Sequence, residues 1–205
     1  MNAVSATAVP RFEYVFSGVQ VHQQPFLHFR VQQVFDGPVC DRLLRWFETE
    51  APWQVATSHF YQIYRFNMLE TPALNSVGCG FAEQTFTQLK GRAEELFGTA
   101  LEDRVTVIAH KVLPGQKIGI HNDAPQGDAE THRLVVQLNS GWKDENGGYL
   151  LFFNSNNPRD IAQIYPPVHN TAVGFELSPH SYHAVSQVEK GTRFSLIYSF
   201  WKRHR

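Results

Sequence analysis

The chain has 205 residues, of which 42% are hydrophobic, 13% aromatic and 18% charged. This is the composition of an ordinary globular protein with enough residues for one domain and a sizeable core, so we expect neither extended disorder nor a second domain. The formal net charge of −1 excludes a broad basic field that would hold a nucleic-acid backbone or an anionic membrane.

The N-terminal residues lack the pattern of a signal peptide. Residues 1–11 are small and polar, and we expect them to form a loose leader. No apolar stretch approaches the length of a membrane span, so the protein is expected to be soluble and cytoplasmic, without a membrane partner. Lys202–Arg205 is expected to be a solvated basic tail. Cys40 and Cys79 lack the spacing of a metal site, so both are expected to be small buried hydrophobic residues.

Strands and bracing helices are predicted over residues 12–104. Phe26–Phe35 is rich in aromatic and β-branched residues and is predicted to be one strand. The sequence Asp36-Gly37-Pro38 then interrupts this pattern and begins a helix, with Asp36 or Gly37 as its cap and Pro38 in its first turn. That helix is predicted to reach about Glu50.

A strand, or two strands, is predicted over Trp53–Met68, where successive residues would alternate between the two faces of a strand. A second helix is predicted over Phe81–Phe97, because a rough apolar stripe there ends at Gly98. Both helices are expected to brace the outside of a sheet.

Residues 105–201 form the predicted core of this single domain. Short β-rich runs alternate there with turns, and their spacing predicts eight strands. They cover Val105–Leu113, Ile118–Asp123, His132–Leu138, Tyr149–Phe153, Asp160–Tyr165, Thr171–Leu177, His183–Val188 and Arg193–Trp201. This pattern predicts a mainly β protein with flanking helices, whose core is a double-stranded β-helix, the jelly-roll or cupin-like barrel that closes around a cavity.

His121 and Asp123 stand two positions apart at the end of an apolar run. On a strand such residues point to the same face, so both side chains can hold one metal ion. A second histidine would complete the set of two histidines and one carboxylate that non-haem Fe(II) oxygenases use. His180 and His183 are the candidates, and because they would face opposite ways on a strand, only one of them can join the metal.

Several motifs follow one another in the second half of the chain. They are His121-Asn122-Asp123, Arg133-Leu-Val-Val-Gln-Leu-Asn139, Gly147-Gly148-Tyr-Leu-Leu-Phe-Phe153, His183-Ala-Val and Arg193-Phe-Ser195. In this order they resemble the iron(II)/2-oxoglutarate dioxygenase superfamily, nearest to its prolyl-4-hydroxylase-like branch. The resemblance implies that His121, Asp123 and His183 bind iron. It favours His183 over His180, because the third ligand of that family is followed by a strand, a turn and a basic residue.

The resemblance also implies Fe(II) as cofactor, 2-oxoglutarate and O2 as co-substrates, and ascorbate as a possible reductant. The far carboxylate of 2-oxoglutarate needs a cation, and the guanidinium of Arg193 can give it two parallel hydrogen bonds. Ser195 shares the face of Arg193 and can donate to the same carboxylate. Gln137 stands where related enzymes often have a tyrosine that touches this carboxylate; packing in the core is its alternative role. Asn139, Asn146, Gly147 and Gly148 are interpreted as turn residues.

The implied activity is hydroxylation of an unactivated carbon, coupled to oxidative decarboxylation of 2-oxoglutarate to succinate and CO2. Asp123 favours hydroxylation, because halogenating relatives carry a small residue at this position. The substrate is expected to be amino-acid-like, either a small free molecule or a residue in a peptide or protein, with proline first. Candidate substrate contacts are Tyr61, Tyr64, Arg65 and Asn154–Asn157.

The sequence also allows two alternative functions. A non-oxygenase cupin could hold a metal in the same barrel, although Arg193-Phe-Ser195 argues against it. A nucleic-acid alkylation-repair dioxygenase shares the His-x-Asp motif and a distal histidine. That family has a second arginine where this chain has Ser199, and the near-neutral charge offers no phosphate-binding field. No nucleic-acid partner is therefore expected.

Overall fold

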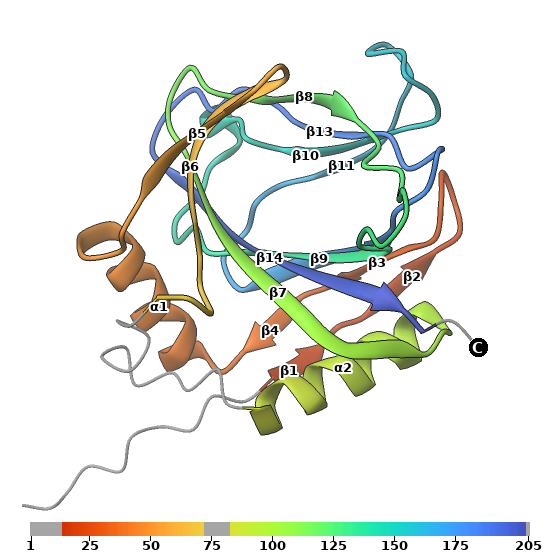
Figure 1. Ribbon diagram of the computed structural model, residues 1–205. Coiled ribbons are helices and arrows are strands. Elements are labelled where there is room, and N and C mark those ends of the chain that lie inside the picture. The colour runs from red at the N-terminus through yellow and green to blue at the C-terminus, as the bar shows by residue number, and fades with distance from the viewer. Residues whose placement is uncertain (1–13, 72–82, 204–205) are drawn as a thin grey trace, which may run out of the picture.

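A computed structural model describes residues 14–71 and 83–203 of the chain (Figure 1). The leader 1–11, Cys79 and the predicted helix start at Phe81 lie outside these residues. The helices are α1 (Gly37–Thr49) and α2 (Glu83–Phe97), with a 3-10 turn η2 (Asp144–Asn146). The strands are β1 (Tyr14–Ser17), β2 (Gln20–His22), β3 (His28–Val31), β4 (Gln33–Phe35), β5 (Gln54–Ser58), β6 (Tyr61–Asn67), β7 (Leu101–Val112), β8 (Ile118–His121), β9 (His132–Gln137), β10 (Leu150–Phe153), β11 (Ile161–Tyr165), β12 (Thr171–Glu176), β13 (His183–Val185) and β14 (Arg193–Lys202).

One antiparallel sheet curls over on itself and makes most of the fold. Its strand order is β11-β10-β13-β8-β6-β7-β14-β9-β12-β3-β2, with β5 paired to β6 beside this path. In Figure 1, β8, β13, β10 and β11 form one layer above β7, β14, β9 and β3, and β6 joins the layers at one side. The strands predicted after Arg104 are all present, as β7 to β14. The predicted double-stranded β-helix in a mainly β protein is confirmed.

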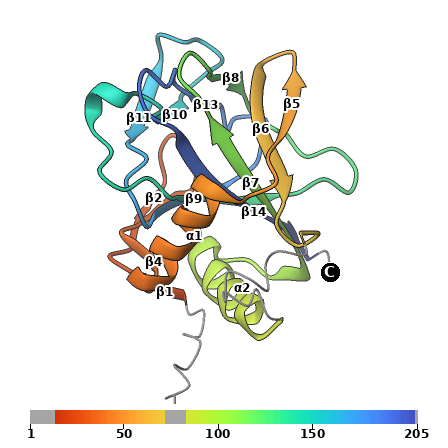
Figure 2. The same ribbon diagram turned by 90° about the vertical axis from the view of Figure 1, so that its left-hand side faces the viewer.

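Both helices lie outside the curled sheet, against its lower layer (Figure 2). Helix α1 begins after Asp36 and ends before Glu50, with proline in its first turn, as predicted. Its apolar side is buried because Val39, Leu43 and Phe47 recur at helical spacing. Helix α2 ends at Phe97, and Gly98 follows with a φ of +64°, a conformation that glycine adopts without a steric penalty.

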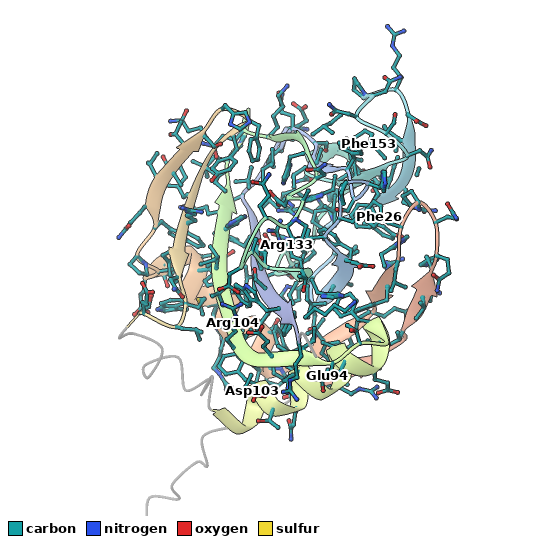
Figure 3. The ribbon with its side chains drawn as sticks, turned by 45° about the vertical axis from the view of Figure 1, so that its right-hand side comes forward. Phe26, Glu94, Asp103, Arg104, Arg133 and Phe153 are labelled. Atoms are coloured by element: carbon teal, nitrogen blue, oxygen red, sulfur yellow. The ribbon has the colours of Figure 1, made fainter. Side chains whose placement is uncertain are left out.

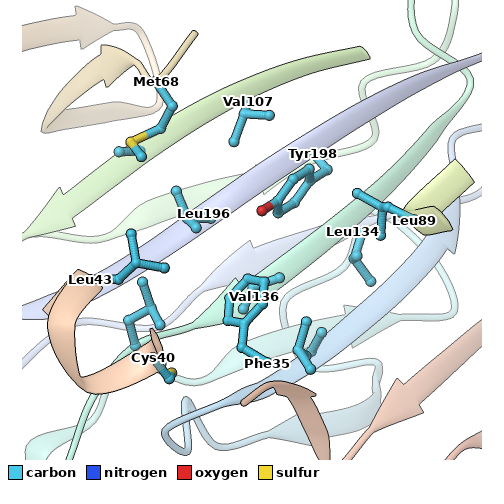
Figure 4. Packing of buried hydrophobic residues seen from close by; sticks show 14 of the residues in the cluster. Phe35, Cys40, Leu43, Met68, Leu89, Val107, Leu134, Val136, Leu196 and Tyr198 are labelled. Atoms are coloured by element: carbon cyan, nitrogen blue, oxygen red, sulfur yellow. The ribbon is translucent and has the colours of Figure 1, made fainter. Parts of the chain in front are cut away.

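The main hydrophobic core lies between the helices and the outer face of the lower layer. Figure 4 shows Leu43 and Cys40 of α1 close to Val136 and Leu196 of β9 and β14. The predicted burial of Cys40 is confirmed, since it is fully buried. A second apolar cluster, which includes Phe152 and Phe175, lies on the inner faces of the two layers. This second cluster packs between the two layers, and its members Val135, Leu150 and Phe175 line the cavity inside the sheet.

The prediction of one strand over Phe26–Phe35 is wrong. The chain bends at Gln32 and forms two strands, β3 in the large sheet and β4 paired with β1 in a separate two-stranded sheet. The Asn170 side chain accepts hydrogen bonds from the backbone N–H groups of Val34 and Phe35 and so fixes the new direction. Burial does not alternate simply across this bend, because Gln32 and Gln33 are exposed whereas Val31, Val34 and Phe35 are buried.

The alternating segment Trp53–Met68 forms a pair of strands, the second of the two predicted arrangements. β5 and β6 form a hairpin with Ser58 opposite Tyr61. Within the described residues, no helix is both long enough and apolar enough to cross a membrane.

Candidate metal and co-substrate site

The side chains of His121, Asp123 and His183 converge inside the curled sheet. One potential ligand atom from each of the three residues lies within 4.8 Å of the others. β8 and β13 pair so that His121 stands directly opposite His183. Oδ2 of Asp123 is 3.3 Å from Nε2 of His121 and 3.7 Å from Nε2 of His183. The structure thus brings together all three residues of the predicted metal triad.

The reason given for the pairing of His121 with Asp123 is wrong, although the two side chains do meet. β8 ends at His121, so Asp123 is not on a strand and strand parity does not apply to it. Asp123 instead has a φ of +47°, in the left-handed region that few non-glycine residues adopt. Such a strained position is typical of functional sites, because the surrounding structure must hold it.

Backbone carbonyls orient both imidazole rings. Nδ1 of His121 donates to the carbonyl of Gly119 at 2.8 Å, and Nδ1 of His183 donates to the carbonyl of Ser181 at 2.7 Å. These bonds leave each Nε2 as the free lone-pair nitrogen directed toward Asp123. The ring of Phe60, in the β5–β6 turn, stacks on His121 with 4.6 Å between centroids. Both rings are therefore held in a metal-binding orientation before any ion arrives.

The charge states of these groups suit a divalent metal. Burial lowers the pKa of His183 to about 3, so its imidazole is neutral at physiological pH. No described residue makes a hydrogen bond to its Nε2. Burial alone would raise the pKa of Asp123, but His121 and the Arg133 guanidinium lower it well below its usual range. Two neutral imidazole nitrogens and one carboxylate oxygen are the donor set that non-haem Fe(II) takes. The residues present therefore fit iron.

His180 does not belong to this group. It lies in the turn before β13 and is exposed, and the metal-binding group contains His183 instead. The turn is nevertheless tied to the site, because the amide of Asn122 donates to the carbonyl of Pro179 at 3.0 Å. Ser181 also donates to the carbonyl of Asn122 at 3.0 Å. These bonds join the two segments that carry the three metal-binding side chains.

Arg193 and Ser195 line the same cavity as the triad. Arg193 is 1% exposed, and its Nη1 donates to Oγ of Ser195 at 3.3 Å. Its Nε and Nη2 have no hydrogen-bond partner among the residues that the structure describes. Burial lowers the pKa of Arg193 to about 10, which leaves the guanidinium charged at neutral pH. A buried cation without an acidic partner is costly to a protein, so this one marks the place of an anion.

The turn between η2 and β10 shapes this end of the cavity. Gly148 has a φ of +69°, and a Cβ there would stand 3.0 Å from Cδ of Arg193. A Cβ at Gly147 would meet the carbonyl oxygen of Gln187 at 2.2 Å. The paired glycines are turn residues, as predicted, and Gly148 also leaves room for the Arg193 side chain. Asn139 secures the neighbouring strand by donating to the carbonyl of Phe194 at 3.0 Å.

Gln137 lies beside this pair but does not line the cavity. It stands directly opposite Ser195 in the β9–β14 ladder and is 2% exposed. Within residues 14–71 and 83–203, its Oε1 has no hydrogen-bond partner. Contact of Gln137 with a co-substrate carboxylate therefore stays a prediction.

Three residues whose role the motifs did not predict also line the cavity: Arg133, Glu130 and His110. Arg133 donates to Asp123 at 2.5 Å and also pairs with Glu130. Figure 3 shows Arg133 inside the curled sheet. His110 lies on β7, and burial together with Arg133, Arg193 and Arg65 lowers its pKa to about 3. Strand alternation places Arg133 and Val135 on the same face of β9, but it does not show that this face is the inner one.

The candidate substrate contacts divide into two groups. Tyr61 and Arg65 line the cavity, as suggested. Tyr64 is not among the residues that line the cavity. Its ring lies instead beneath the ammonium group of Lys111. Residues Asn154–Asn157 form a turn in which Asn154 donates to Asp160, and they do not line the cavity.

Comparison with known proteins agrees with this geometry. Residues 109–201 match the family model described as the 2OG-Fe(II) oxygenase superfamily. No curated protein matched the chain. Among solved structures, a prolyl-4-hydroxylase from Pseudomonas putida is 21% identical with a TM-score of 0.60, over 81% of this chain and 86% of the other.

Two further structures have the same fold. A prolyl hydroxylase from Trichoplax adhaerens, in complex with a hypoxia inducible factor peptide fragment, has a TM-score of 0.66 at 12% identity, over 85% of this chain and 83% of that one. A 2OG-Fe(II) oxygenase family oxidoreductase from Burkholderia pseudomallei has a TM-score of 0.61 at 19% identity, over 87% and 86%. The architecture is therefore that of prolyl-4-hydroxylase-like oxygenases.

The barrel and its His-Asp-His group define an iron-dependent oxygenase, with Fe(II) as cofactor and 2-oxoglutarate and O2 as co-substrates. Residues 109–201 match the 2OG-Fe(II) oxygenase superfamily, and this part of the chain is that of a 2-oxoglutarate-dependent oxygenase. The superfamily predicted from the motifs is confirmed.

Proposed function

We propose that this oxygenase hydroxylates an unactivated carbon of an amino-acid-like substrate, with His121, Asp123 and His183 as iron ligands. The observation that carries this proposal is the buried guanidinium of Arg193, which has two unpartnered nitrogens in the cavity that also holds the triad. A dicarboxylate that reaches from the metal to Arg193 would satisfy both ends of the site.

When bound, Fe(II) supplies the chemistry in which O2 decarboxylates 2-oxoglutarate to succinate and CO2 and one oxygen atom enters a substrate C–H bond. The chain's own residues fix the geometry of that reaction. His121, Asp123 and His183 would hold the metal, and a set of three protein ligands would leave its other coordination positions for co-substrate and O2.

Arg193 and Ser195 have a binding role in this proposal. The guanidinium offers two N–H donors to the far carboxylate of 2-oxoglutarate, and Ser195 can donate its hydroxyl hydrogen because its oxygen already accepts a bond from Arg193. The apolar side chains of Val135, Leu150 and Ile197 line the cavity between these polar groups. They exclude water from the reacting atoms, which strengthens the ion pair with Arg193.

A residue within a peptide is the form of substrate that the comparisons favour. The Trichoplax adhaerens structure is a prolyl hydroxylase in complex with a peptide fragment, and a prolyl-4-hydroxylase from Pseudomonas putida shares its fold with this chain. Proline is therefore the first amino acid to test. The cavity has a volume of about 250 Å³, below the roughly 300–1,000 Å³ of most ligand sites, so we expect only a small part of the substrate, such as one side chain, to enter it.

The test is succinate formation from 2-oxoglutarate in air with Fe(II) and ascorbate, across free amino acids and short proline-containing peptides. The expected result is stimulation of succinate formation by one of these compounds, which gains one oxygen atom by mass spectrometry. Stimulation without oxygen incorporation into any compound would contradict hydroxylation. Absence of both succinate formation and 2-oxoglutarate binding would instead support the alternative function, that of a non-oxygenase cupin.

A further inference from the structure

The cavity is lined by a third arginine that neither the metal triad nor the Arg193 clamp uses. Arg65 of β6 lines the cavity, and within the described residues it makes no hydrogen bond or ion pair with a carboxylate. The other two arginines of the cavity have assigned partners. Arg133 is paired with Asp123 and Glu130, and Arg193 is the proposed anchor of 2-oxoglutarate.

Cross-strand register fixes where Arg65 lies relative to that anchor. Arg65 stands directly opposite His110, and His110 stands directly opposite Ser195 on its other side. Directly opposed residues of an antiparallel pair point to the same face. Neighbouring strands are roughly 4.8 Å apart, so the backbones at Arg65 and Ser195 are separated by about 10 Å. His110 fills the position between them, and Arg65 is thus placed to hold a different anion from the one at Arg193.

His110 adds a neutral hydrogen-bonding group to this second position. Its pKa, lowered to about 3 by burial and by the three surrounding arginines, keeps the ring uncharged at physiological pH. A neutral imidazole can donate one hydrogen bond to a carboxylate and adds no further positive charge. Arg65 and His110 therefore form a matched pair of donors on adjacent strands.

Charge balance indicates that the ligand at this position is anionic. Fe(II) and 2-oxoglutarate carry equal and opposite charges. The charges of Asp123 and Glu130 are balanced by Arg133 and Arg193, which leaves Arg65 uncompensated among the described residues that line the cavity. A substrate that brings one carboxylate would neutralise the loaded site.

Arg65 also stands where the cavity opens to the surface. Tyr61, Arg65 and Ile108 line both the inner cavity and an open hollow along β5 and β6 that includes Gln54 and Thr57. Arg65 itself is exposed. A substrate that enters along this hollow passes the guanidinium before its reacting carbon reaches the metal position.

From these observations we infer that Arg65 and His110 bind a carboxylate of the substrate and select acidic substrates over neutral ones. This inference rests on the proposed function. The carboxylate can be the α-carboxylate of an amino acid or the side-chain carboxylate of an acidic residue beside the reacting one in a peptide.

The experiment is calorimetric titration under nitrogen, so that the protein with Fe(II) and 2-oxoglutarate binds probes without turnover. One arm compares N-acetyl-L-amino acids, proline first, with their amides. The second arm compares the amidated dipeptides N-acetyl-Pro-Glu and N-acetyl-Pro-Gln. In one arm the acid should bind about 10- to 100-fold tighter than its neutral partner, the worth of a charge-assisted hydrogen bond. The arm that shows this preference identifies the source of the carboxylate.

Arg65→Gln should abolish that preference, and Arg65→Lys should keep part of it. Arg159→Gln is the matched control, because Arg159 is exposed on a turn outside the cavity and its loss changes the net charge equally. Equal binding of acid and neutral partner in both arms, or a preference that survives Arg65→Gln, would overturn the inference. Failure of 2-oxoglutarate itself to bind the wild-type protein would instead refute the proposed function, so the two failures are distinguishable.

Discussion

Arg133 donates a hydrogen bond of 2.5 Å to Oδ2 of Asp123, the same carboxylate oxygen that faces Nε2 of His121 and of His183. Arg133 is itself held by Glu130. The carboxylate is thereby fixed in place although its residue lies beyond the end of β8 at a positive φ. Partners behind a ligand of this kind usually set the orientation of the ligand and its affinity for metal.

Replacing Arg133 should weaken metal binding. We expect Arg133→Gln to lower Fe(II) affinity by roughly 10- to 100-fold, because Asp123 loses the group that orients it. Arg133→Lys should recover part of the loss. Fe(II) titration under nitrogen measures the affinity, and a melting curve checks that each variant is folded.

Arg104→Gln is the control for this variant. Arg104 also pairs with a carboxylate, that of Asp128, but it lies near α2 and outside the cavity (Figure 3). Its loss should leave Fe(II) affinity unchanged. An Fe(II) affinity of Arg133→Gln equal to that of the wild type would show that Asp123 needs no support.

The metal triad makes a prediction of its own. His121→Ala, Asp123→Ala and His183→Ala should each abolish succinate formation and lower Fe(II) affinity, because each removes one of the proposed ligands. His180→Ala should retain iron, since His180 is exposed in the turn before β13. Iron content is measured by mass spectrometry. Loss of iron in His180→Ala together with retention of iron in His183→Ala would show that His180, and not His183, is the third ligand.

The buried guanidinium of Arg193 predicts a gain in stability when it is removed. Replacing buried charge by an apolar side chain of similar volume can stabilise a protein by about 1 to 4 kcal/mol. We therefore expect Arg193→Met to melt at a higher temperature than the wild type without 2-oxoglutarate, and to lose the further stabilisation that 2-oxoglutarate gives. A destabilised variant whose melting temperature still rises with 2-oxoglutarate would contradict the clamp.

His110 predicts a pH dependence of stability. Its pKa in the folded protein, about 3, lies below its ordinary value of 6.5. Between these values the unfolded chain binds a proton that the folded protein does not, so stability is fully present above pH 6.5 and is lost as the pH falls. From pH 7 to pH 5 this one group should cost about 2 kcal/mol of unfolding free energy.

Urea unfolding of the wild type and of His110→Gln at both pH values measures the effect. The variant should lose about 2 kcal/mol less than the wild type over this interval. His132 and His183, whose pKa values are also lowered, to about 4 and about 3, contribute equally to both proteins. Identical losses of unfolding free energy in the two proteins would show that folding does not lower the pKa of His110.

The order of elements in the barrel could be predicted from the sequence because β alternation and turn residues are local signals. The strands β7 to β14 and the helix ends at Asp36 and Gly98 follow from such signals. The bend at Gln32 was missed because its cause is the Asn170 side chain, far away in sequence. Long-range partners of this kind leave no local pattern.

Some residues of the candidate site could be predicted from the sequence and others could not, for a similar reason. His121, Asp123 and His183 were found because their spacing and order resemble a known family, although the strand-parity reason given for Asp123 was wrong. Arg133 and His110 were missed because their role depends on which face of a strand points inward. That choice is made by how the sheet curls, which the alternation of residues along one strand does not reveal.

The role of Arg193 can be decided by calorimetric titration of 2-oxoglutarate under nitrogen, with and without Fe(II), into the wild type and into Arg193→Ala. We expect one site per chain that requires both the metal and Arg193, with an affinity lower by about 10- to 100-fold in the variant. Binding that is equally tight without Fe(II), or equally tight in Arg193→Ala, would contradict this role.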